Sequence, residues 1–111
     1  MKRYALLITL LLAGPAYADS RGGDLAAACN SSSGTTGDVL CDAYINGFVN
    51  GVLLDQIGSQ QGTPICIPDG LATADIRRTL QQFAKAHPET LYTTSGPFMA
   101  AALMTTYPCK R

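Results

Sequence analysis

The stretch that decides the fold is "DVLCDAYINGFVNGVLLDQI", residues 38–57. Its apolar side chains recur at every fourth position on two adjoining rows, which is typical of one face of an α-helix. The rows are Tyr44, Phe48 and Val52, and Cys41, Ile45, Val49 and Leu53. Asp38 is a residue type that caps helix N-termini. The pattern therefore predicts a helix that begins at Asp38 and ends at about Ile57.

Two glycines, Gly47 and Gly51, lie inside this predicted helix with G-x-x-x-G spacing. In an apolar membrane helix this spacing marks a dimerisation face. Here polar residues accompany the glycines, namely Asp42, Asn46, Asn50, Asp55 and Gln56. Each glycine costs the helix about 0.8–1.0 kcal/mol relative to alanine. We therefore expect the glycines to serve the close approach of another helix.

The flanking segments also have helical patterns. A short helix is predicted from about Asp24, as its N-cap, to Cys29, and the polar run "NSSSGTTG" after it is a loop. A third helix is predicted from about Thr73 to His87, which caps its C-terminus before Pro88. A last helix begins around Ser95 and runs to Pro108. No segment alternates like a strand, so the fold class is all-α, a small four-helix bundle.

The first residues, "MKRYALLITLLLAGPAYA", have the pattern of a signal peptide. Two basic residues precede an apolar run that is shorter than the roughly 20 residues of a membrane span. The run ends in Ala16-Tyr17-Ala18, which a signal peptidase would cleave. We therefore predict a cleaved signal peptide over residues 1–18, cut before Asp19, and a single domain over residues 19–111 in the periplasm.

Four cysteines lie in the predicted mature chain, at Cys29, Cys41, Cys66 and Cys109. An even number in a short exported chain indicates two disulfides, for which three pairings exist. In an up-and-down bundle the first helix ends beside the start of the second, and the third begins beside the end of the fourth. This arrangement favours Cys29–Cys41 and Cys66–Cys109 over the other pairings. The second bridge would tie down the end of the chain.

The sequence also argues against catalysis and metal binding. The gaps between the cysteines are 12, 25 and 43 residues, and none matches a zinc site. His87 is the only histidine, and the sequence shows no glycine-rich phosphate loop. The predicted mature chain has six basic and eight acidic residues, too few positive charges for nucleic acid. We therefore predict no enzyme activity, no metal and no cofactor, and a role in binding.

Three stretches together carry a resemblance to a known family: "CDAYINGFVNGV", "ICIPDGLATADIRRTLQQFAKAHPETLY" and "AAALMTTYPC". They are similar to the Rap/Tai family of type VI secretion immunity proteins, over roughly residues 41–109. The matching positions, in order, are Cys41, Tyr44, Ile45, Gly47, Cys66, Ile67, Pro68, Gly70, His87, Pro88, Glu89, Ala102, Leu103, Pro108 and Cys109.

The resemblance implies a periplasmic protein that binds and inhibits a peptidoglycan amidase effector. It also implies a helical, disulfide-bonded homodimer that plugs the amidase's Cys/His active-site cleft with a loop. The alternative is a periplasmic acid-stress chaperone, which would unfold in acid through a cluster of carboxylates. Eight scattered acidic residues provide little of such a trigger.

Two segments are candidates for the loop that contacts the partner. "GSQQGTP" over residues 58–64 offers Gln60 and Gln61, and "ETLYTTSGP" over residues 89–97 offers Leu91 and Tyr92. Exposed tyrosines often anchor interfaces. The alternative for Leu91 and Tyr92 is that they fold back over the end of the bundle. If neither segment binds, the contact would lie on a helix face with Arg77, Arg78 and Lys85.

Overall fold

The computed structural model describes residues 20–58 and 64–110, and this part of the chain is helical. The elements are α2 (Gly22–Cys29), α3 (Thr36–Gly58), α4 (Thr73–Ala86), the 3-10 helix η1 (Pro88–Tyr92) and α5 (Ser95–Thr106). The described residues form isolated β-bridges but no strand. The predicted all-α fold with four helices is confirmed. The predicted signal peptide, residues 1–18, lies outside the described residues.

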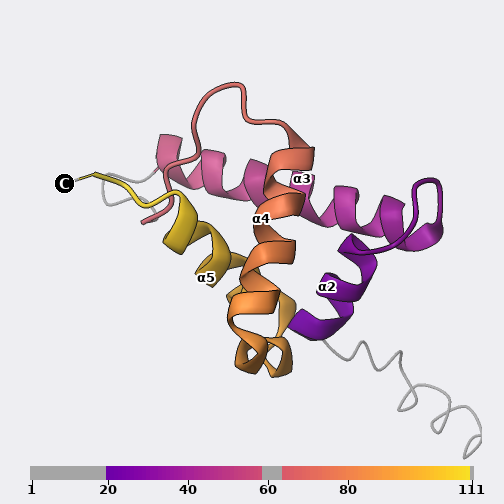
Figure 1. Cartoon of the computed structure of the whole chain (residues 1–111). Helices are drawn as coiled ribbons and strands as arrows, with labels where there is room; N and C mark the ends of the chain where they lie inside the picture. The colour runs from indigo at the N-terminus through magenta and orange to yellow at the C-terminus, as the bar shows by residue number, and fades with distance from the viewer. Residues whose placement is uncertain (1–19, 59–63, 111) are drawn as a thin grey trace, which may run out of the picture.

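The helices pack around α2 and α4. The short helix α2 contacts α3, α4, α5 and η1, and α4 contacts α3 and α5 as well. In Figure 1 the longest helix, α3, runs across the molecule behind α4 rather than alongside it. None of the described helices is both long enough and apolar enough to cross a membrane.

Helix α5 supplies the centre of the core. Phe98, Met99, Ala102 and Leu103 are fully buried on it, and they meet Ile45 of α3 and Leu80 of α4 in one apolar cluster. The ring of Phe98 lies 5.9 Å from that of Phe83 on α4, centroid to centroid. The predicted rows of α3 therefore supply part of the core, through Cys41, Ile45 and Val52, whereas Leu53 is exposed.

Both predicted disulfides are present. Cys29 at the end of α2 is joined to Cys41 in α3, with the Cα atoms 5.0 Å apart, and both residues are buried. Cys66 is joined to Cys109 with a Cα separation of 4.8 Å, and Cys66 is exposed at the surface. One bridge therefore lies inside the core and the other lies on the outside of the molecule.

The second disulfide holds the chain after α5 against the extended segment that precedes α4. The backbone N–H of Cys66 donates to the carbonyl of Tyr107 at 2.8 Å, and that of Cys109 donates to the carbonyl of Pro64 at 3.2 Å. Ile65 and Pro108 form an antiparallel bridge between these two bonds. The terminal cysteine is thus the tether that its position in the sequence indicated.

Helices α4 and α5 begin at Thr73 and Ser95 as predicted, whereas the starts of α2 and α3 differ from the predicted ones by two residues. Helix α2 begins at Gly22 with Arg21 as its N-cap, and Asp24 accepts a hydrogen bond from the backbone N–H of Arg21 at 3.0 Å. Helix α3 begins at Thr36, and Asp38 in its first turn accepts the N–H of Gly34 at 2.9 Å. Asp24 and Asp38 therefore stabilise the first turns from inside the helices, because the positive end of the helix dipole favours an acidic side chain.

Three glycines of the helices have contrasting surroundings. A Cβ added at Gly22 would lie 2.8 Å from the carbonyl oxygen of Thr90 and 2.9 Å from Cγ of Phe98, so α2 begins in close contact with η1 and α5. At Gly47 and Gly51 an added Cβ would meet none of the described atoms within 4 Å. The expected close approach of another helix to these two glycines is not found within the described part of the chain, because they face outward.

Candidate functional site

The connection between α4 and α5 carries the predicted contact residues Leu91 and Tyr92. It forms the compact helix η1, in which the N–H of Thr90 donates to the carbonyl of His87 at 3.0 Å. Leu91 is partly buried and packs against the core, whereas the side chain of Tyr92 is 78% exposed. The structure therefore separates the two residues: Leu91 helps to cover the end of the bundle and Tyr92 projects from it.

The residues before α2 and at its start hold this connection in place. The N–H of Gly22 donates to the carbonyl of Thr93 at 2.6 Å, and the N–H of Ser95 donates to the carbonyl of Ser20 at 2.8 Å. The hydroxyl of Ser95, which is buried, also donates to the carbonyl of Arg21 at 3.0 Å. With Pro88 at its other end, the segment that carries Tyr92 is fixed on both sides.

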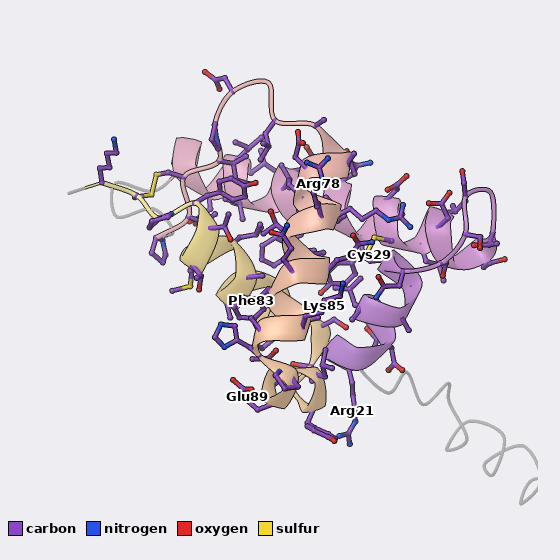
Figure 2. All side chains as sticks on the ribbon, viewed as in Figure 1. Arg21, Cys29, Arg78, Phe83, Lys85 and Glu89 are labelled. Carbon is purple, nitrogen blue, oxygen red and sulfur yellow. A yellow bond between two sulfur atoms is a disulfide. The ribbon has the colours of Figure 1, made fainter. Side chains whose placement is uncertain are left out.

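A hollow of about 610 Å³ lies between η1 and the start of α2. Its walls are formed by Arg21, Gly23, Asp24, Pro88, Glu89, Leu91 and Tyr92. Figure 2 shows Arg21 and Glu89 at the same end of the molecule, around η1. The hollow therefore offers an apolar wall and side chains of both charges next to the exposed tyrosine.

His87 lies beside this site and contacts Phe83 and Glu89. Its ring is 4.5 Å from that of Phe83, and its Nδ1 atom lies 3.4 Å from Oε1 of Glu89. In residues 20–58 and 64–110 no group of three or more His, Cys, Asp or Glu side chains is arranged to hold a metal. The geometry is suited to binding a partner, as an extended surface with one projecting aromatic side chain.

The other predicted contact residues divide into three cases. Gln60 and Gln61 lie outside the described residues. Arg78 and Lys85 are exposed on α4, and Figure 2 shows them at different levels of the helix. Arg77 is largely covered and is paired with the carboxylates of α3. The three basic side chains therefore do not form one surface.

The comparison with protein families decides where this chain belongs. The family model of the Rap1a immunity proteins matches residues 21–109, which include α2 to α5, η1 and both disulfides. The chain belongs to the Rap1a immunity protein family. Neither the comparison with curated proteins nor the comparison with solved structures finds a match.

Family membership gives the protein its general role. A Rap1a immunity protein implies protection against a secreted effector through binding of that effector. The match begins at Arg21 and so also covers α2, which the resemblance seen in the sequence did not include. Arg21 and Asp24 line the hollow, yet sequence reasoning missed them, because they lie far along the chain from Tyr92 and no local pattern signals that contact.

Arg77 joins α4 to both α2 and α3 in this Rap1a immunity protein. Its Nε donates to the carbonyl of Cys29 at 2.9 Å, and its Nη1 donates to Asp38 and, at 3.4 Å, to Asp42. The amide of Gln81 donates to the same Cys29 carbonyl at 2.8 Å. These bonds satisfy the carbonyl oxygen of Cys29, which has no partner within α2, next to the buried disulfide.

The pKa of Asp38 is lowered by this arrangement. The largest cause is the hydrogen bond from the N–H of Gly34, followed by that from Arg77. A carboxylate whose pKa is lower in the folded than in the unfolded state stabilises the fold above its unfolded pKa, and this contribution is lost as the pH falls through the folded value. The relevant window therefore lies below the ordinary value of 3.8.

We expect Asp38→Asn to lower the free energy of unfolding at neutral pH and to lower it less in acid. The difference in unfolding free energy between wild type and variant should shrink between about pH 7 and about pH 2, because protonation removes the same charge from the wild type. Urea unfolding followed by circular dichroism at both pH values measures it. Asp55→Asn, at an exposed position of α3, is the control. A difference for Asp38→Asn that is the same at both pH values would contradict this assignment.

Proposed function

We propose that this protein inhibits a peptidoglycan amidase effector of type VI secretion in the periplasm by inserting η1 into the active-site cleft. The observation that carries the proposal is the exposed side chain of Tyr92 on a segment fixed at both ends. A binding segment that is already ordered loses little conformational entropy when it associates. The family match supports the immunity role, and the resemblance of residues 41–109 supports the kind of effector.

The inhibition that we propose needs no chemistry from the immunity protein. A Cys/His hydrolase requires its peptide substrate to reach the thiolate through an open cleft. Tyr92 would enter that cleft, while the hollow lined by Leu91, Arg21 and Glu89 receives side chains from the rim of the effector. Tyrosine suits this role because it buries a large rigid ring and keeps a hydroxyl group for a hydrogen bond.

The predicted signal peptide and the two disulfides support the periplasmic part of the proposal. Disulfides persist in oxidising compartments such as the bacterial periplasm. Peptidoglycan lies in that same compartment, so inhibitor and amidase would meet there. A homodimer completes the proposal, and apolar side chains exposed on α3, such as Leu40 and Leu54, support it.

Tyr92→Ala is expected to weaken binding of the amidase by about 30-fold or more. Truncation of a central aromatic anchor costs about 2 kcal/mol or more, and each 1.4 kcal/mol is tenfold in affinity. The fold should be unaffected, because the side chain is exposed. Calorimetric titration against the proposed amidase effector, with amidase inhibition measured in parallel, gives the result.

Gln82→Ala, at an exposed position on α4, is the matched control and should bind like wild type. A combined Gln60→Ala and Gln61→Ala variant tests the other predicted segment. If that variant loses inhibition while folded Tyr92→Ala keeps it, η1 is not the segment that enters the cleft. If every variant inhibits like wild type, neither segment is, and if wild type does not bind the amidase, the proposed effector is wrong.

A further inference from the structure

Helix α3 is apolar on two sides, but the described residues cover only one of them. The inner side carries the buried Cys41, Ile45 and Val52, and it packs against α2 and α4. The opposite side, here called the α3 outer face, consists of exposed residues: Val39, Leu40, Ala43, Gly47, Asn50, Gly51 and Leu54. Leu40 is 59% exposed and Leu54 is 70% exposed.

The α3 outer face carries no charge. The three charged residues of α3, Asp38, Asp42 and Asp55, all lie outside it, and the first two are paired with Arg77 of α4. A helix face that meets only water normally carries charged or polar side chains. Contiguous apolar side chains on a surface indicate a contact with another molecule.

The spacing of the outer face is symmetric about its middle. Leu40 and Leu54 lie seven residues to either side of Gly47, and Ala43 and Gly51 lie four residues to either side. These spacings place all five residues on one stripe of a helix. The stripe has a bulky residue at each end and small residues between them, so it is complementary to its own reversed copy.

We propose that the α3 outer face pairs antiparallel with the same face of a second copy of this chain, about a two-fold axis at Gly47. This pairing rests on the homodimer under the proposed function and gives it a surface and an orientation. Leu40 of one copy would contact Leu54 of the other, Ala43 would face Gly51, and the two Gly47 residues would meet at the axis. An isologous contact of this kind closes after two copies.

The glycines and the helix dipoles both favour this arrangement. A Cβ at Gly47 or Gly51 would meet none of the described atoms, so the backbone of α3 is open to a second helix. Antiparallel pairing brings Asp38 of one copy level with Asp55 of the other, but both carboxylates lie outside the α3 outer face and so do not enter the contact. It also opposes the two helix dipoles, which is more favourable than aligning them side by side.

The length of the α3 outer face indicates how tightly the two copies should bind. Residues 39–54 span about 24 Å of helix at 1.5 Å per residue. A contact one helix wide over this length is smaller than the standard interface of about 800 Å² per partner. We therefore expect a dimer that dissociates in the micromolar range.

Cysteine cross-linking tests the orientation. The two native disulfides leave no free thiol among the described residues, so an added cysteine is the site of reaction. Leu40→Cys and Leu54→Cys chains, mixed and treated with a short bismaleimide, should give a covalent dimer, and each chain alone should give far less. Gln82→Cys on α4 is the control for random collision. A product of Leu40→Cys with itself that matches the mixed product would overturn the antiparallel orientation.

Gly47→Glu tests the surface itself. It should raise the dissociation constant of the dimer at least tenfold in sedimentation velocity, while circular dichroism and inhibition of the amidase stay as in wild type. If wild type is a monomer at about 100 μM, well above the expected dissociation constant, both the homodimer and this surface are wrong. If wild type dimerises and Gly47→Glu does so equally well, the homodimer stands and the α3 outer face is not its interface.

Discussion

Replacing both Cys66 and Cys109 with serine is expected to lower the free energy of unfolding by about 2–5 kcal/mol. The bridge closes 43 residues of sequence, for which the loop-entropy estimate is about 4 kcal/mol. Cys66 is exposed and Cys109 is half-buried, so the serine hydroxyls can reach water and add little penalty of their own. Urea unfolding followed by far-UV circular dichroism gives the difference.

Changing both cysteines avoids a free thiol that could attack the other disulfide. Thr105→Ser, on the exposed side of α5, is a suitable control and should change the unfolding free energy by less than about 0.5 kcal/mol. If the double variant unfolds at the same urea concentration as wild type, the tether at the end of the chain contributes nothing to stability.

Phe98→Ala is the second substitution with a large expected effect, a loss of about 3–5 kcal/mol. Phe98 is fully buried and packs between Phe83 of α4 and the backbone of Gly22 on α2. Its removal leaves a cavity where three helices meet, and a rigid core refills such a space only in part. Thermal and urea unfolding both measure the loss.

Met104→Ala on the same helix is the matched control. Its side chain is 44% exposed, so truncation removes less buried surface and should cost about 1 kcal/mol or less. A cost for Phe98→Ala as small as that of the control would mean that Phe98 is not the centre of the core.

The core and the disulfides could be predicted because both depend on local patterns and short connections. The apolar periodicity of residues 38–57 located α3, and "HPET" marked the end of α4. With the helices in order, the loop after α2 brings Cys29 to Cys41. The tail after α5 then brings Cys109 to the segment before α4, through the backbone bonds of Cys66.

The candidate site could be predicted only in part. Tyr92 was chosen as a candidate because it is an aromatic residue in a polar connection. The chain that follows η1 is held by hydrogen bonds from Gly22 and to Ser20, which are distant in sequence. The sequence pattern also could not predict that Gly47 and Gly51 face outward. Because α3 is apolar on two sides, periodicity alone cannot tell which side the rest of the chain covers.

The contacts between residues 20–22 and residues 93–95 join segments from opposite halves of the sequence. A chain that crosses a membrane starting with its N-terminus delivers the first partner of each hydrogen bond long before the second. In an exported chain the surface around Tyr92 would therefore be completed only after residues 93–95 have followed. Under the proposed function, a chain halted partway through translocation would lack this surface and would give the cell no protection.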